Sequence, residues 1–133
     1  MKKYICCIIL DLSLSIVPAH ATTAWTSSEC NTEKGGEIVE VGGDSFCKAR
    51  GGMNWWSAYA WCQKLGGRMP TISELCPNKP LTVGTKCGRD YPGTFYIWSS
   101  TPNGDRMWTA EKNAGMSSHR PRNDNWEETY CLK

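Results

Sequence analysis

The clearest periodic pattern in the chain lies in MNWWSAYAWCQKLGG, where apolar residues recur at helical spacing. The residues at positions i, i+3, i+4, i+7 and i+10 are Trp55, Ala58, Tyr59, Cys62 and Leu65, which share one face of a helix. Asn54 is a favourable N-cap, and Gly66-Gly67 can adopt the positive φ that ends a helix. The pattern predicts a helix whose apolar face turns Cys62 into the domain.

A second, shorter helix is predicted directly after the first. Thr71 and Glu74 have the spacing of a capping box, in which each side chain bonds the backbone amide of the other residue. Pro70 disfavours helical backbone at the residue before it, so it separates the two helices. Cys76 closes this helix and Pro77 stops it.

Alternating apolar and polar residues predict strands on both sides of the helices. The segment 37–49, EIVEVGGDSFCKA, alternates around a Gly-Gly-Asp turn and predicts a β-hairpin. Strands are also predicted in TFYIWSST, RMWTAE, MSSH and WEETYCLK, with turns at PNGD and KNAG and a loop at RPRNDN. Residues 77–94 form a long loop. We therefore expect an α+β domain, with two short helices packed on a small antiparallel sheet.

The N-terminus has the pattern of a secretory signal peptide spanning residues 1–21. Two lysines precede an apolar run that is too short to span a membrane, and an Ala-His-Ala cleavage pattern follows. The remainder, 22–133, is expected to be a single domain with an irregular lead-in over 22–36 and no membrane span. Removing Lys2, Lys3 and Asp11 from 15 basic and 13 acidic residues leaves a net charge of about +1. This balance does not favour nucleic-acid binding.

Six cysteines remain after the predicted signal peptide, and an even number in a small secreted chain indicates a disulfide framework. They are Cys30, Cys47, Cys62, Cys76, Cys87 and Cys131. No two of them have the close spacing of a structural zinc site or of a redox C-x-x-C motif. By proximity alone, Cys30–Cys47 would fasten the lead-in to the hairpin, and Cys76–Cys87 would fasten the long loop.

The motif W-x-x-A-x-x-x-C-x-x-L-G-G-R-M-P-T-x-x-E-L over residues 55–75, followed by WSST and a near-terminal cysteine, resembles bacterial secreted domains with a C-type lectin-like fold. The resemblance is closest to the C-terminal domain of bacterial collagen-like adhesins, and it covers about residues 36–133. It implies that the cysteine of the first helix, Cys62, pairs with that of the last strand, Cys131. The other four cysteines would then form the two local pairs, Cys30–Cys47 and Cys76–Cys87.

The calcium-dependent sugar site of such folds is broken here. The family pattern Glu-Pro-Asn or Gln-Pro-Asp is replaced by Thr101-Pro102-Asn103, and the tryptophan expected before Asn123-Asp124 is replaced by Arg122. Asp105 and Asp124 are too few carboxylates for the 6–8 oxygen ligands that calcium prefers. We therefore expect no cofactor, with calcium as the alternative.

Trp108 and Trp126, which lie beside polar loops, indicate the candidate ligand surface. Trp55 and Trp98 are expected in the core, and Trp56 and Trp61 to be partly exposed or packed on the sheet. Exposed indoles among polar side chains can stack on sugars or anchor a protein, although packing within the sheet explains each tryptophan singly. The candidate ligand-binding residues are Asn103, Asp105, Arg106, Trp108, Arg120, Arg122, Asn123, Asp124 and Trp126.

Catalysis is not expected. Glu127 and Glu128 are adjacent on a predicted strand and so point to opposite faces. His119 lacks an activated nucleophile, and Ser99-Ser100 lack the elbow motif of hydrolases. We expect a secreted bacterial binding module, adhesin-like, that recognises a glycan or a host or cell-surface ligand, such as a surface protein, through its loop face. The alternative is a structural or accessory subunit of a surface assembly, such as a pilus or secreted complex, in which the fold contacts protein.

Overall fold

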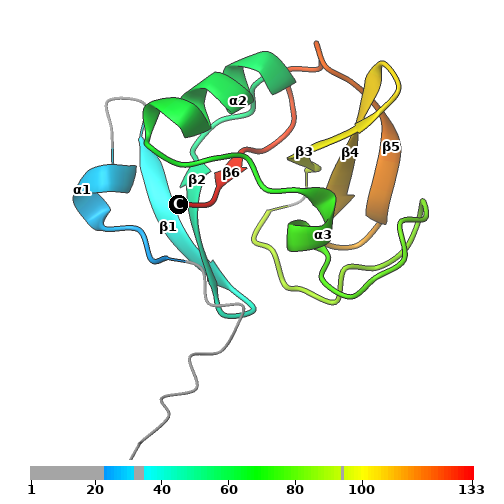
Figure 1. The fold of residues 1–133 in the computed structure, drawn as a ribbon, viewed down its shortest axis with the longest axis horizontal. Helices are drawn as coiled ribbons and strands as arrows, with labels where there is room; N and C mark the ends of the chain where they lie inside the picture. Colours follow the sequence, from blue (N-terminus) through cyan, green and yellow to red (C-terminus); the bar gives the residue numbers. More distant parts are fainter. Residues whose placement is uncertain (1–22, 32–34, 94) are drawn as a thin grey trace, which may run out of the picture.

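The computed structural model describes residues 23–31, 35–93 and 95–133, with the side chain of His119 excepted. The predicted signal peptide, residues 1–21, therefore lies outside the described residues. The described chain has three helices and six strands (Figure 1). In chain order they are α1 (Ser27–Cys30), β1 (Gly36–Val41), β2 (Asp44–Ala49), α2 (Trp55–Lys64), α3 (Ile72–Leu75), β3 (Ile97–Asn103), β4 (Arg106–Glu111), β5 (Gly115–Pro121) and β6 (Tyr130–Cys131).

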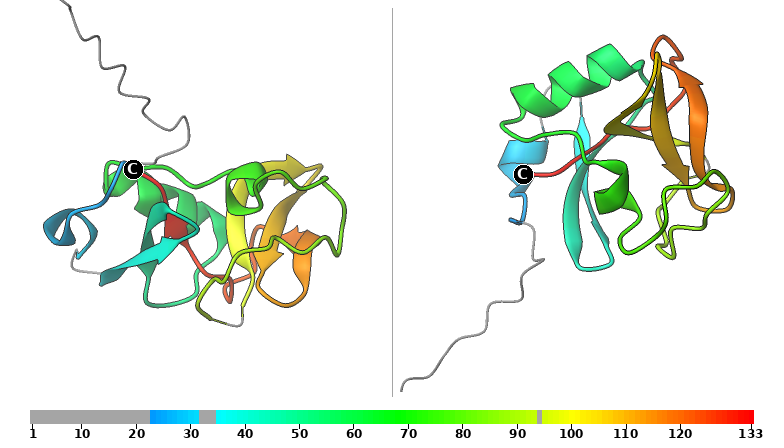
Figure 2. Two further views of the ribbon diagram at one scale, coloured as in Figure 1. Left: turned by 90° about the horizontal axis from the view of Figure 1, so that it is seen from below. Right: turned by 45° about the vertical axis from the view of Figure 1, so that its right-hand side comes forward.

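The strands form two three-stranded antiparallel sheets rather than the single sheet expected from the sequence. One sheet has the order β1-β2-β6 and the other β3-β4-β5 (Figures 1 and 2). The hairpin β1–β2 turns at Gly42 and Gly43, both of which have positive φ. The final strand is far shorter than WEETYCLK, because only Tyr130 and Cys131 pair with β2. The α+β class is confirmed, and the sheet arrangement is corrected.

Helix α2 crosses one side of the molecule and covers both sheets (Figure 1). Its buried side chains, Ala58, Trp61 and Cys62, pack in a cluster with residues of β2, β3, β4 and β6. The expected face was wrong in part: Trp61 is buried, whereas Tyr59 is 40% exposed. The buried face of α2 therefore includes Trp61 and excludes Tyr59.

A second cluster of buried side chains lies around α3, between the two sheets. It joins Ile72 and Leu75 of α3 to Phe46 of β2 and to Ile97 and Trp108 of the second sheet. Figure 2 shows α3 beside β3 and β4 in both views. The expected core position of Trp98 is confirmed, because its side chain is fully buried and its indole nitrogen donates to Met53 O at 2.8 Å.

The lead-in was predicted to be irregular, and its described part contains one short helix, α1, among residues without regular structure. Thr26 and Glu29 form a capping box that starts α1. Trp25 is 5% exposed and its indole Nε1 donates to the carbonyl oxygen of Cys131 at 3.0 Å. The capping pair Thr26–Glu29 was readable in TSSE, but the burial of Trp25 depends on a contact with the opposite end of the chain.

Three disulfides join the cysteines in the expected pairs. They are Cys30–Cys47, Cys62–Cys131 and Cys76–Cys87, with sequence separations of 17, 69 and 11 residues. The bond between Cys62 and Cys131 connects α2 to β6, as the resemblance implied. The bond Cys30–Cys47 joins the end of α1 to β2, and Cys76–Cys87 joins the end of α3 to the loop that follows it.

The predicted capping box of α3 is confirmed, since Thr71 Oγ1 accepts from Glu74 N at 3.2 Å and Glu74 Oε1 accepts from Thr71 N at 3.0 Å. Replacing Thr71 by alanine removes the side-chain acceptor of the Glu74 amide, which keeps only the backbone oxygen of Thr71 at 3.1 Å. We expect T71A to lower the free energy of unfolding by about 1 kcal/mol, measured by urea denaturation. The neighbouring exposed Ser73 provides the control S73A, which should change stability far less. Equal losses in both variants would contradict the capping role.

Candidate functional site

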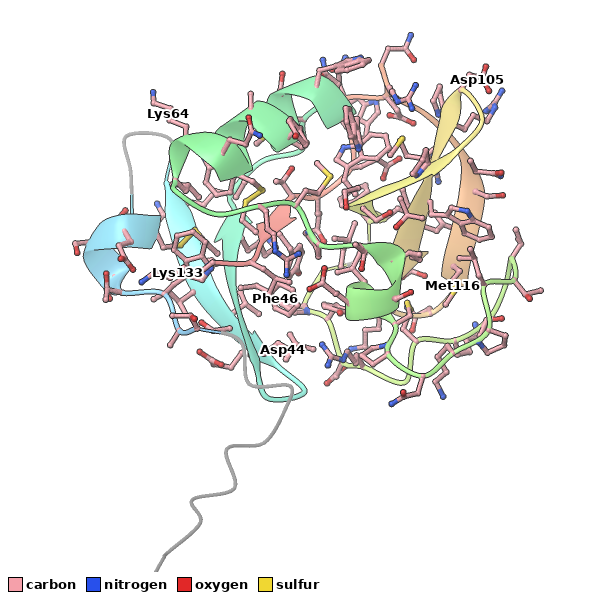
Figure 3. The ribbon with its side chains drawn as sticks, in the orientation of Figure 1. Asp44, Phe46, Lys64, Asp105, Met116 and Lys133 are labelled. Carbon is pink, nitrogen blue, oxygen red and sulfur yellow. A yellow bond between two sulfur atoms is a disulfide. The ribbon has the colours of Figure 1, made fainter. Side chains whose placement is uncertain are left out.

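The candidate ligand residues of the sequence fall into two neighbouring segments at one end of the second sheet. Asn103, Asp105 and Arg106 form the exposed turn between β3 and β4, and Figure 3 shows Asp105 at its tip. Strand pairing places Arg106 opposite Pro121, so the turn lies beside the start of the segment 122–126. The structure therefore brings most of the expected residues to one end of the domain.

Trp108 does not belong to this exposed end. Its side chain is 9% exposed and packs with Tyr91, Ile97 and Met116 in the cluster around α3. Met107, the residue before it, points to the other face and joins the cluster under α2. Because both faces of β4 are covered, Trp108 offers little surface to a ligand, and its role is packing.

An ionic cluster holds the segment 122–126 against β5. Arg120 Nη1 lies 3.3 Å from Glu127 Oε1 and 3.5 Å from Asp124 Oδ2, and its guanidinium carbon lies 4.4 Å from the centre of the Tyr96 ring. Asp124 Oδ1 also accepts from the backbone nitrogen of Trp126 at 3.3 Å. Arg120 and Asp124 thus shape the loop that carries Trp126.

Glu127 is a buried carboxylate that sequence reasoning did not single out as a site residue. Its side chain is 2% exposed, and burial raises its pKa to about 7. The positive charge of Arg120 opposes the increase, and the nearby carboxylate of Asp124 adds to it. Glu128 has a different partner, Lys48, so the two adjacent glutamates do not act as a pair.

An open groove of about 340 Å³ lies between the end of β2 and the C-terminal segment. Two exposed aromatic rings line it: Trp126 is 74% exposed and Phe95 is 54% exposed. The remaining lining residues are Lys48, Ala49, Arg50, Gly51, Gly52, Asn125 and Glu128. Of this set, the sequence had indicated Trp126 alone.

Glycine forms the wall of the groove where the two segments approach most closely. A Cβ on Gly52 would lie 2.8 Å from the carbonyl oxygen of Trp126 and 2.9 Å from that of Asn125. Any larger residue would therefore displace the loop that carries the indole. The RGG sequence directly after a strand was the readable signal for this contact, because consecutive glycines allow backbones to approach.

Two charged residues of the groove, Lys48 and Glu128, form an ion pair. Lys48 Nζ lies 3.6 Å from Glu128 Oε1 and 3.7 Å from Glu37 Oε1. Burial raises the pKa of Glu128, and the positive charge of Lys48 opposes that increase. The groove thus combines apolar rings with a lysine–carboxylate pair that can exchange hydrogen bonds with a polar ligand.

A second exposed aromatic group lies at the start of α2, outside the lining of the groove. We call it the aromatic ledge, and it consists of exposed Trp56 and Tyr59 with Trp55, which was expected in the core and is partly buried against the cluster under α2. The guanidinium carbon of Arg122 lies 5.4 Å from the centre of the Trp55 ring and 5.6 Å from that of Trp56. Arg122, an expected ligand residue, therefore faces the ledge, while Trp126 lines the groove.

The described part of the chain contains no cluster of metal-binding side chains. No group of three or more His, Cys, Asp or Glu side chains could hold an ion there. Asp124, one of the two carboxylates considered for calcium, is engaged by Arg120. The side chain of His119 lies outside the described structure.

The chain was compared with protein-family models, with curated proteins and with solved structures, and no match was found in any of the three. In the described residues, no helix is both long enough and apolar enough to cross a membrane.

Proposed function

We propose that this protein is a secreted bacterial binding module, adhesin-like, with a C-type lectin-like domain that recognises a glycan or another cell-surface ligand. The observation that carries the proposal is the groove lined by the exposed rings of Trp126 and Phe95. Exposed aromatic rings that gather in a groove rimmed by polar residues are typical of ligand sites, and sugar rings stack on them well.

The polar lining supports a sugar as the ligand. Sugars present hydroxyl groups that both donate and accept hydrogen bonds, so they need a mixture of donors and acceptors beside the stacking ring. Lys48 supplies donors, Glu128 supplies acceptors and Asn125 supplies both. The open shape suits a chain that passes through the groove rather than a small molecule enclosed on all sides.

Secretion and the lectin-like fold are supported by the disulfides and by the motif around α2 and α3. Three disulfides in one small domain are typical of proteins that fold in an oxidising compartment. The connection of α2 to β6 through Cys62 and Cys131 is the pairing that C-type lectin-like folds use.

The groove is tested by the variant W126A on an immobilised glycan array. We expect the wild-type protein to bind a defined set of glycans saturably and W126A to bind them at least about tenfold more weakly, which corresponds to about 1.4 kcal/mol. The control L81A removes an exposed apolar side chain of the long loop that is not part of the lining, and it should bind as the wild type does. Absence of glycan binding by the wild type, or equal binding by W126A, would contradict the glycan proposal.

The alternative is a subunit of a surface assembly such as a pilus or a secreted complex. This alternative predicts no glycan binding and a specific partner that co-purifies with the protein. The aromatic ledge, which lies outside the groove, is the observation that favours a protein contact.

A further inference from the structure

We propose that the aromatic ledge, with Arg122, is a docking surface for a protein segment that presents an acidic side chain beside an apolar one. This inference goes beyond the proposed function, because it assigns a second surface that shares no residue with the lining of the groove.

The ledge exposes an unusual amount of aromatic surface for one short stretch of helix. Trp56 is 60% exposed and Tyr59 is 40% exposed, and Trp55 lies between them. The rings of Trp55 and Tyr59 are stacked with centres 5.2 Å apart, and those of Trp55 and Trp56 meet edge to face at 4.9 Å. Tryptophan, tyrosine and arginine are the residues that contribute most at protein interfaces.

Contacts within the domain hold Trp55 and Arg122 in place before any partner binds. The indole nitrogen of Trp55 donates to Ser99 O at 2.9 Å, and its backbone nitrogen donates to Arg122 O at 3.0 Å. Arg122 Nε donates to the sulfur of Met107 at 3.2 Å, and this contact helps to hold the guanidinium in place. Binding to fixed side chains loses little conformational entropy, so such a surface is well suited to docking.

The charge of the ledge indicates the chemistry of the partner. In the described part of the chain, no carboxylate forms an ion pair with Arg122, and α2 contains no acidic residue. The guanidinium is half-buried against two indoles, so a carboxylate that reached it would be partly shielded from water. A partner carboxylate would therefore pair with Arg122 while a neighbouring apolar side chain covers Trp56.

A protein fits the ledge better than a sugar does. The three side chains come from the start of α2, and none of them lines the groove of about 340 Å³. Apart from Arg122, the ledge offers a sugar only the tyrosine hydroxyl and the indole N–H of Trp56, so it has few acceptors for sugar hydroxyls. An apolar side chain of a protein requires only contact with the rings.

The test is a selection of displayed random short peptides on the immobilised wild-type protein, followed by affinity measurement with one enriched peptide. We expect the enriched sequences to combine Asp or Glu with a large apolar residue. The variants R122Q and W56A should each weaken binding of that peptide about tenfold or more. The control K64Q removes the exposed cation at the other end of α2 and should leave the affinity unchanged.

A double-mutant cycle then separates direct pairing from a structural effect. Replacing the acidic residue of the peptide by its amide should weaken binding to the wild type but not further weaken binding to R122Q. Both variants should keep the wild-type melting temperature within a few degrees and should keep any glycan binding of the groove. The proposal is overturned if no peptides are enriched, if the enriched peptides lack acids, or if W126A rather than W56A abolishes their binding. It is equally overturned if W56A removes glycan binding, or if the ledge proves to join two copies of this chain.

Discussion

Replacing Cys62 and Cys131 together by alanine is expected to lower the free energy of unfolding by about 4 kcal/mol. Both cysteines are fully buried, and their disulfide closes a loop with a sequence separation of 69 residues. A long loop loses more conformational freedom in the unfolded chain when it is closed, so this bond stabilises more than a short-range one. Because β6 contributes only two residues to its sheet, the bond is also its main attachment to α2.

The matched comparison is the local pair Cys76–Cys87, which closes a loop with a separation of only 11 residues. The variant C76A/C87A should lose about 3 kcal/mol, and the order of the two losses is the essential prediction. Guanidinium denaturation of both variants, with the wild type alongside, measures them. A smaller loss in C62A/C131A than in C76A/C87A would contradict the dominance of the long-range bond.

Glu127 is expected to make the protein less stable as the pH rises from 5 to 8. Its pKa is about 7 in the folded protein against an ordinary value of 4.5, because burial disfavours the charged form. The folded state therefore holds the proton more tightly than the unfolded state does. The stability that the protonated side chain contributes is fully present below about pH 4.5 and is lost as the pH rises through 7. For this one group the difference between pH 5 and pH 8 is about 2–3 kcal/mol.

The variant E127Q removes the titration while keeping the shape of the side chain. We expect the difference in unfolding free energy between the wild type and E127Q to change by about 2–3 kcal/mol between pH 5 and pH 8, in the direction that favours the wild type at pH 5. The control E40Q, on exposed Glu40, should show no such change. The charged groups that face Glu127 are Arg120 and Asp124. A constant difference across the range would show that Glu127 is ionised throughout.

Much of the local structure could be predicted from the sequence, because it depends on neighbours along the chain. The capping box of Thr71 and Glu74, the N-cap at Asn54 and the glycine turn of the hairpin all act within a few residues. The same holds for the two local disulfides. The pairing of Cys62 with Cys131 required a resemblance to known folds, since proximity could not indicate it.

The candidate site was predictable only in part. The polar turn around Asp105 and the segment around Asp124 were recognised, because polar residues between strands are exposed. The sequence did not distinguish Trp108 from Trp126, since each lies beside a polar loop. Their environments differ because β4 is covered on both faces, whereas the backbone beyond β5 runs along the surface.

The sequence by itself determined the α+β class, the starts of α2 and α3 and the cysteine framework, because capping, turn formation and hydrophobic periodicity are properties of short segments. Only the tertiary structure decided that the end of β2 and the segment 125–128 would form one groove, and that Arg122 would lie over the indoles of Trp55 and Trp56. It also decided the pKa of Glu127. Each of these depends on groups far apart in the chain, whose approach is set by the packing of two sheets around α2 and α3 and by the bond that joins α2 to β6.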